Sequence, residues 1–397
     1  MKGFITSAVF LVAALLAFLL GGLLPDYVSA FFYSISLLIK ECMIFALPLV
    51  IFSLIFTSIC RIGVGSVKSL AIAIPLIVGS NFANTLIAYF LGASCINAGL
   101  ISSIDTISAS GAASFAPLFC FLLPKIISND FALVSAVICG VVYAAIARRD
   151  LGARLDVNIR KAHEHFSRFL ETFIRGFFKV LAPLMPLFIF GTIVKLSRDG
   201  IISQILSEYL MIMAIFFISA YGYVLAQLFI LSTGSLKRCG NYLKNILPAV
   251  ITGFGAMSSA AALPLSIKAA EENSTNRDNA RIIAPCSVNI HLVGDCFFIP
   301  FIALVMLISF GKDLPSFTTY LIFAAHFVAA KFAVAAVPGG GILVMLPVLQ
   351  KYLGFNADML GLLTGLYVLF DPFITGCNVI GNGSLAIAFD KLMKLKK

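Results

Sequence analysis

Charged residues are scarce in this chain. Asp, Glu, Lys and Arg make up 12% of its 397 residues, against roughly a quarter in soluble domains. The few charges are bunched, and they leave long apolar runs such as residues 4–24. A run of this length can cross about 30 Å of hydrocarbon. The composition therefore excludes an ordinary soluble domain and predicts a polytopic membrane protein.

Several other patterns are missing. Polar and apolar residues do not alternate as they do in an outer-membrane barrel, so the spans are predicted to be helices, whose backbone groups satisfy one another. The nine cysteines include no CxxC pair and no zinc-binding spacing, and they are predicted to be small core residues in a reducing compartment. An HExxH motif and a nucleophile elbow are also absent, which argues against common hydrolase chemistry.

The net charge of +10 comes from basic clusters that follow hydrophobic runs, within residues 148–168, 237–244 and 391–397. These clusters fit cytoplasmic anchors under the positive-inside rule better than a nucleic-acid surface. Both termini are therefore predicted to be cytoplasmic, in a chain that spans the inner membrane many times and has the lipid bilayer, and no nucleic acid, as a partner. Segment 93–117 has Asp105 as its only charge and is predicted to face outward.

The apolar pattern changes after residue 236. Before it, plausible spans cover residues 4–24, 28–62, 66–91, 132–146, 166–193 and 209–232. After it, two segments rise to a small polar tip and descend: 241–273 with the tip GAMSSAAALP, and 326–355 with the tip VPGGG. Each is followed by a span predicted to be broken, 280–310 at NIHLVGD and 357–392 at DPFITGCNVIGNGS. Interrupted segments in corresponding positions of two halves are typical of a transporter binding site.

The tips and the last span carry the polar residues that could bind a ligand. Paired serines at the first tip fit a grip on a substrate carboxylate, although close packing of small residues is an alternative. An intramembrane aspartate must be paired or functional, and an amino group is a natural partner for it. The candidates on one helical face of the last span, at i, i+4, i+7 and i+11, are Asp371, Thr375, Asn378 and Asn382.

These motifs, in this order, resemble the dicarboxylate/amino acid:cation symporter family (sodium:dicarboxylate symporters), which includes the glutamate transporters. The resemblance covers nearly the whole chain and is strongest over residues 253–390. It implies an all-α polytopic membrane protein with eight transmembrane helices and two re-entrant helical hairpins, assembled as a homotrimer of elevator-type transporters. It also implies scaffold helices in 1–62, a transport-domain helix in 63–96, scaffold and trimerisation helices in 115–199, and a transport core in 205–397.

The same resemblance implies roles for individual residues. Asp371 matches the aspartate that holds the substrate amino group, with Thr375 beside it, and Asn378 matches an asparagine whose region serves both substrate and sodium. The hairpin positions that match the substrate site or keep the tip are Ser258, Ser259, Val337, Pro338, Gly339 and Gly341.

This sequence also departs from the family pattern. Ile374 stands where members that carry acidic substrates have an arginine, so a side-chain carboxylate would lack its bidentate partner. A neutral amino acid is therefore favoured over glutamate or aspartate. The family motif N-M-D-G-T corresponds to HLVGD here, residues 291–295, so the sodium-site aspartate is Val293. A second sodium-site aspartate of the family is replaced by Asn382 in this chain. These replacements leave at most vestigial sodium sites near Asn289, Asn378 and Asn382.

The altered ligands predict altered coupling. Sodium stoichiometry is reduced, or coupling has moved to protons through His291 and Asp295, which helical spacing would place on one face. Alternatively these two residues simply pair as a structural replacement for the lost ion. Lys331 would repel a nearby sodium ion, or its ammonium would occupy the vacated position. Asp295 also takes the position of a threonine that lies near the substrate side chain in the family, so the resemblance implies that it could admit a polar or cationic side chain. Apart from the coupling cation, no cofactor is expected.

The predicted function is secondary active transport without enzymatic activity. Its substrate would be a small amino acid, preferably neutral, or a dicarboxylate, carried in symport with a cation. A proton-coupled or uncoupled exchanger and an anion-conducting channel remain alternatives. A remote alternative is an intramembrane serine hydrolase built from Ser259, His291 and an aspartate.

Overall fold

The computed structural model describes residues 67–100, 153–198, 201–332, 334 and 340–395, together with parts of 12–63 and 116–143. Every long regular element in these residues is a helix, which confirms the all-α prediction for this part of the chain. The helices are α2 (Asp26–Gly63), α3 (Val67–Asn97), α5 (Ala153–Arg198), α6 (Ile201–Leu231), α7 (Leu236–Ala256), α8 (Ser259–Asn273), α9 (Arg277–Ser287), α10 (Val293–Ser309), α11 (Phe317–Lys331), α12 (Gly340–Leu353) and α13 (Ala357–Leu395).

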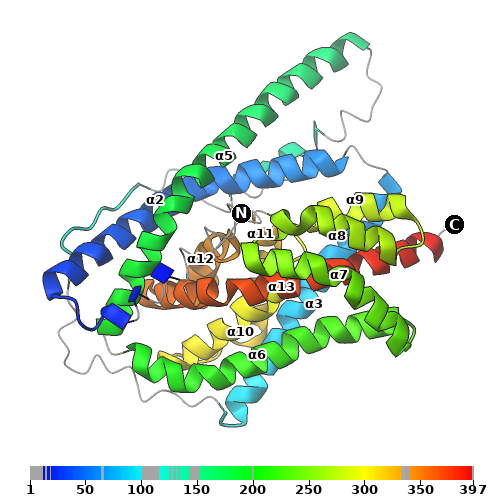
Figure 1. The fold of residues 1–397 in the computed structure, drawn as a ribbon. Coiled ribbons are helices and arrows are strands. Elements are labelled where there is room, and N and C mark those ends of the chain that lie inside the picture. Colours follow the sequence, from blue (N-terminus) through cyan, green and yellow to red (C-terminus); the bar gives the residue numbers. More distant parts are fainter. Residues whose placement is uncertain are drawn as a thin grey trace.

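Two groups of helices are visible in Figure 1. Helices α2 and α5 pack extensively against each other, beside a larger bundle that contains α3 and α6 to α13. Within the bundle, α13 contacts α6, α7, α8, α9 and α10, and α10 also packs along α3. The buried core is densest along α10, where almost every residue is inaccessible to solvent. The bundle thus surrounds the two segments that carry most of the predicted site.

Three helices in the described part of the chain are long and apolar enough to cross a membrane: Ala71–Asn97, Met211–Leu231 and Asp358–Lys394. Many large apolar side chains on such helices are exposed, including Ile218, which is 75% exposed, and Ile230, which is 73% exposed. Exposed apolar surface of this kind fits contact with lipid rather than water. The predicted spans 4–24 and 132–146 lie wholly or partly outside the described residues.

The first predicted hairpin corresponds to α7 and α8, which pack against each other. Helix α7 ends at Ala256 and is capped by Met257, whose left-handed backbone (φ 49°) lets its N–H return to the carbonyls of Gly253 and Phe254. Ser258 then caps α8, since its hydroxyl accepts a hydrogen bond from the N–H of Ala261 at 3.3 Å. The tip is therefore only two residues long, and it brings the end of one helix against the start of the next.

The second hairpin corresponds to α11 and α12, which also pack together. Helix α11 begins at Phe317, nine residues earlier than the predicted start at 326, and is capped by the hydroxyl of Ser316. Most of its tip, including Val337, Pro338 and Gly339, lies outside the described residues. Whether either hairpin re-enters a membrane stays a prediction.

The break predicted at NIHLVGD separates α9, which ends at Ser287, from α10, which begins at Val293. Side chains from two other helices satisfy its backbone. The amide of Asn81 on α3 donates to the carbonyl of Ile290 at 2.6 Å and accepts from the N–H of Leu292 at 3.3 Å. The amide oxygen of Asn378 on α13 accepts from the N–H of Gly294 at 2.8 Å. Buried polar backbone outside a helix requires such partners.

The break predicted in the last span is wrong. Helix α13 is continuous from Ala357 to Leu395, through DPFITGCNVIGNGS. Pro372 lacks one N–H donor, but the loss of one bond kinks a helix rather than ending it. The Tyr221 hydroxyl donates to the carbonyl of Phe373 at 2.7 Å.

At the other end of α13, Asp390 accepts from the backbone N–H groups of Thr275 and Asn276, which anchors the turn between α8 and α9.

Candidate functional site

One cavity gathers most of the residues predicted from sequence. The space between its side chains, counted together with its open mouth, is about 260 Å³. Four segments far apart in the sequence form it: the two hairpins, the start of α10 and the middle of α13. Its lining residues are Met257, Ser258, Ser259, Leu292, Asp295, Val334, Gly341, Tyr367, Asp371, Thr375 and Asn378.

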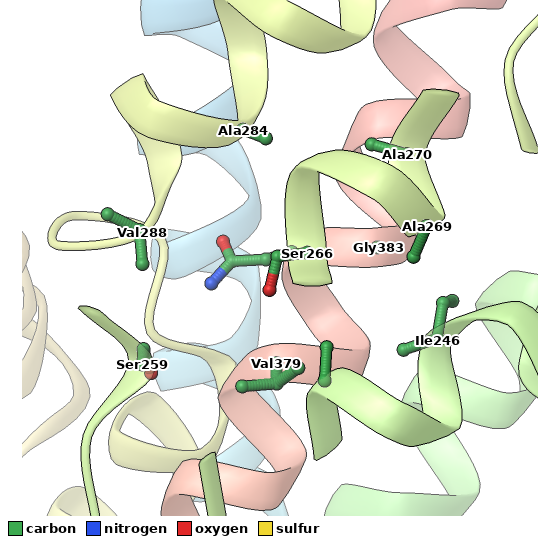
Figure 2. A pocket seen from close by; sticks show the side chains of 11 residues that line it. Ile246, Ser259, Ser266, Ala269, Ala270, Ala284, Val288, Val379 and Gly383 are labelled. Atoms are coloured by element: carbon green, nitrogen blue, oxygen red, sulfur yellow. The ribbon is translucent and has the colours of Figure 1, made fainter. Parts of the chain in front are cut away.

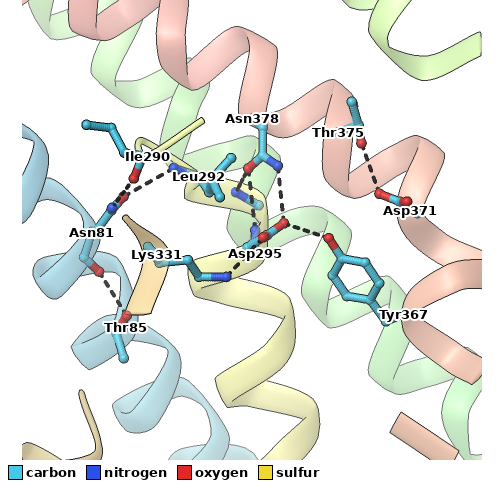
Figure 3. A network of polar contacts seen from close by, with 11 residues as sticks. Asn81, Thr85, Ile290, Leu292, Asp295, Lys331, Tyr367, Asp371, Thr375 and Asn378 are labelled. Atoms are coloured by element: carbon cyan, nitrogen blue, oxygen red, sulfur yellow. Dashed lines mark hydrogen bonds and ion pairs between the residues drawn. The ribbon is translucent and has the colours of Figure 1, made fainter. Parts of the chain in front are cut away.

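Asp371 supplies a carboxylate to the cavity. It is 3% exposed, and its Oδ1 accepts a hydrogen bond from the Thr375 hydroxyl one helical turn later, at 3.0 Å (Figure 3). The threonine fixes the orientation of the carboxylate and leaves it facing the cavity that both residues line. A buried carboxylate at a cavity wall is a natural partner for a substrate ammonium group.

Two helix N-termini meet the same cavity. Helix α8 presents Ser259 from its first turn, and α12 presents Gly341. The first N–H groups of a helix have no partner within the helix, and the helix dipole makes this end favourable for an anion. Of the two aspartates that line the cavity, Asp295 is paired with Lys331. Asp371 and the two positive helix ends give the charge pattern that complements an amino-acid zwitterion.

A second buried aspartate, Asp295 in the first turn of α10, has partners on every side (Figure 3). Its Oδ2 lies 2.9 Å from the Nζ of Lys331. Its Oδ1 accepts from the Tyr367 hydroxyl at 3.1 Å and from the amide of Asn378 at 3.2 Å. Asp295 and Lys331 are 1% and 0% exposed at the side chain, so they form a fully buried ion pair.

These partners change two predictions made for Asp295. Both of its oxygens are already engaged by groups of the protein, so it does not offer a charge to a cationic substrate side chain. It also does not pair with His291. The helix break falls between the two residues, since α10 begins at Val293, and they therefore do not share a helical face.

His291 instead contacts two neutral side chains. Its Nε2 lies 2.9 Å from the Ser80 hydroxyl, and its Nδ1 lies 3.3 Å from the amide oxygen of Asn382. The imidazole is 1% exposed. Among the described residues it makes no hydrogen bond to Ser259, so the serine–histidine arrangement that a hydrolase would need is not assembled.

A second cavity, of about 360 Å³ including its open mouth, lies between the first hairpin, α9 and α13 (Figure 2). Asn382 lines this cavity rather than the first one, while Ser259 lines both. The other lining residues are mostly small or apolar: Ile246, Ala249, Ser266, Ala269, Ala270, Ala284, Val288, Val379 and Gly383. Because it brings no charged side chain to a ligand, the first cavity is the better candidate site.

Five other predicted positions are not among the described lining residues of the first cavity, and two polar residues near the site were not predicted. Val337, Pro338 and Gly339 lie outside the described residues, and Asn289 is half-buried in the helix break. Ile374 is fully buried and does not line the cavity. Tyr367 and Asn81 were missed, although Tyr367 stands one helical turn before Asp371 and so shares its face. Asn81 carries no such signal, because it reaches the break from a distant helix.

The chain is similar to proteins of one known family. The model of the family described as "Sodium:dicarboxylate symporter family" matches residues 7–392. The chain is 28% identical over 203 residues to mouse (Mus musculus) excitatory amino acid transporter 1, which covers 51% of this chain and 37% of that protein. It is 26% identical over 254 residues to human (Homo sapiens) neutral amino acid transporter B(0), which covers 63% of this chain and 45% of that protein. The matched stretches thus span less than half of these relatives.

Proposed function

This chain belongs to the sodium:dicarboxylate symporter family, and on that premise we propose that it is a secondary transporter of a small neutral amino acid, coupled to a cation. One observation carries the proposal: the cavity that sets the Asp371 carboxylate against the N-termini of α8 and α12. The substrate ammonium would bind Asp371, and its carboxylate would bind the helix ends.

Two features favour a neutral side chain. Ile374 stands where family members that carry acidic substrates have an arginine, so an acidic substrate side chain would lack its cationic partner. Ile374 also does not line the cavity. Asp295 is neutralised by Lys331, so a cationic side chain finds no free partner there. A cavity walled by Leu292, Val334 and the Tyr367 ring leaves room for a small apolar or weakly polar group.

The proposal also includes the family's mode of operation. The chain would cross the inner membrane in eight helices with two re-entrant hairpins and cytoplasmic termini, and it would assemble as a homotrimer. In an elevator mechanism, residues 1–62 and 115–199 would act as scaffold, while 63–96 and 205–397 would move with the substrate. Helices α2 and α5 pack more extensively against each other than against the larger bundle, which supports this division.

The test is uptake into proteoliposomes that contain the purified full-length protein. Radiolabelled amino acids and dicarboxylates are supplied with an imposed sodium gradient, an imposed pH gradient, or neither. We expect uptake of alanine- or serine-sized neutral amino acids, driven by a cation gradient. Preferential uptake of aspartate or glutamate would contradict the neutral substrate. Uptake driven by the pH gradient alone would identify protons as the coupling ion, and uptake that neither gradient increases would contradict coupling.

A further inference from the structure

Lys331 carries a positive charge deep inside the protein, directly behind the substrate cavity. Its side chain is 0% exposed, and its Nζ lies 2.9 Å from one oxygen of Asp295. The ammonium also lies 4.5 Å from the centre of the Phe327 ring, over its face. Lys331 is the last residue of α11, so its charge stands at the negative end of a helix dipole. A carboxylate, an aromatic face and a helix C-terminus each stabilise a monovalent cation.

The ion pair joins two elements that are distant in the sequence. Lys331 belongs to α11 and Asp295 to α10, so the pair ties the second hairpin to the broken helix. The other arm of the hairpin is equally close, because a methyl group on Gly341 would lie 2.4 Å from Asp295 Oδ2 and 2.3 Å from the Tyr367 oxygen. Both arms of the second hairpin thus approach Asp295, α11 through the Lys331 ammonium and α12 through the backbone at Gly341.

An isolated carboxylate cannot remain charged at this depth without a cation beside it. The cation could come from solution, or the chain could supply it. Here the chain supplies it, and a solute ion approaching Asp295 Oδ2 would have to displace a covalently tethered ammonium.

We infer that the Lys331 ammonium is a tethered cation that takes the place of a dissociable ion at Asp295, and that it holds the second hairpin against α10 without loading an ion there. The inference rests on the proposed function, because it describes how one wall of that transport site is held. A tethered cation returns with the protein after every cycle, so it closes the hairpin but draws no energy from an ion gradient.

Chemical rescue tests the inference without any substrate, so its outcome is independent of whether transport is found. The full-length protein is purified in detergent, and its Tm is followed by circular dichroism. The Lys331→Ala variant removes the ammonium and leaves a cavity in place of the rest of the lysine side chain. We expect its Tm to fall, and to rise again with n-butylammonium chloride more than with 1-butanol plus choline chloride at the same concentrations. Lys351→Ala, which removes an exposed lysine of α12, should show neither effect.

The double variant Asp295→Asn with Lys331→Ala removes both charges and provides the matched control. If the ammonium acts as a cation for Asp295, n-butylammonium will stabilise the double variant no more than the butanol control does. Equal rescue of the single and double variants would overturn the inference, as would failure of n-butylammonium to exceed butanol in the single variant. If the single variant does not fold, a folded double variant supports the inference. If neither folds while Lys351→Ala does, packing volume rather than charge holds the site, and the inference is wrong.

Discussion

Asp295 and Asp371 are buried aspartates that line the same cavity, but their surroundings differ. Asp295 is held by an ammonium, a phenol and an amide, so its role is to connect α10 to α11 and α13. Asp371 is oriented by the hydroxyl of Thr375, which is neutral. The two aspartates are equally buried, so burial alone does not distinguish their roles.

The Asp371→Asn variant separates these roles. The amide keeps the shape and can still contact the Thr375 hydroxyl, but it cannot form an ion pair with a substrate ammonium. Since a hydrogen bond to a charged group contributes about 1.5–3 kcal/mol, we expect the KM for the transported amino acid to rise about 10- to 100-fold. The measurement is the concentration dependence of uptake in proteoliposomes. Asp313→Asn changes an exposed aspartate and should leave KM unchanged; an unchanged KM in Asp371→Asn would contradict the assigned role.

The sequence indicated these side chains unevenly. Asp371, Thr375 and Asn378 were predicted from helical spacing, and that spacing holds because α13 is regular through all of them. The same rule failed for His291 and Asp295, because helical periodicity does not extend across a break. The partners Lys331–Asp295 and His291–Ser80 join distant segments, 36 and 211 residues apart. Local pattern carries no information on such pairings.

At the scale of elements, the helix break at residues 288–292 is held by side chains from neighbouring helices. Asn81 and Asn378 bind backbone groups on the two sides of it, and Gly294 lets α10 approach α13 closely. A methyl group at Gly294 would lie 2.4 Å from the backbone carbonyl oxygen of Ile374. Glycine is therefore required here by the approach of another backbone, rather than by a left-handed conformation.

Gly294→Ala tests this requirement. Since backbone atoms cannot rotate away as a side chain can, α10 and α13 must move apart, at a cost of about 1–3 kcal/mol. We expect a lower Tm in detergent and a weaker contact between Asn378 and the start of α10. The matched control is Gly222→Ala on α6, where an added methyl group meets nothing within 4 Å and the change should stay within about 0.5 kcal/mol. Equal Tm values for the two variants would show that the break tolerates a side chain.

Glycine and proline patterns predicted helix breaks correctly only where side chains elsewhere in the fold cap the helix ends. Around GAMSSAAALP and NIHLVGD, capping by Ser258, Asn81 and Asn378 stabilises the helix ends. Around Pro372 the chain has a comparable composition, yet α13 continues, with the Phe373 carbonyl bonded by Tyr221. Whether a polar interruption ends a helix thus depends on partners from elsewhere in the fold, which a single sequence does not specify.

At the scale of the whole molecule, the tethered ammonium would affect how much charge crosses the membrane in each cycle of the proposed transport. The Lys331–Asp295 pair has no net charge and moves with the protein, so it adds nothing to the charge delivered with the substrate. Replacing both residues by neutral ones leaves this sum unchanged. Replacing Lys331 alone leaves an uncompensated carboxylate, which a cation from solution must neutralise before the second hairpin can close.

The charge carried per substrate molecule should therefore depend on whether Asp295 is neutralised by the tethered lysine or by an ion from solution. In proteoliposomes, the ratio is obtained from the membrane potential at which net uptake stops, at fixed substrate and ion gradients. We expect the same ratio for the unmodified protein and for Asp295→Asn combined with Lys331→Met. Lys331→Met alone should gain one positive charge per substrate, because a dissociable ion then occupies the position of the ammonium. An identical ratio in all three proteins would mean that Asp295 recruits no ion when its lysine is removed, and that the lysine serves only to pack the hairpin against α10.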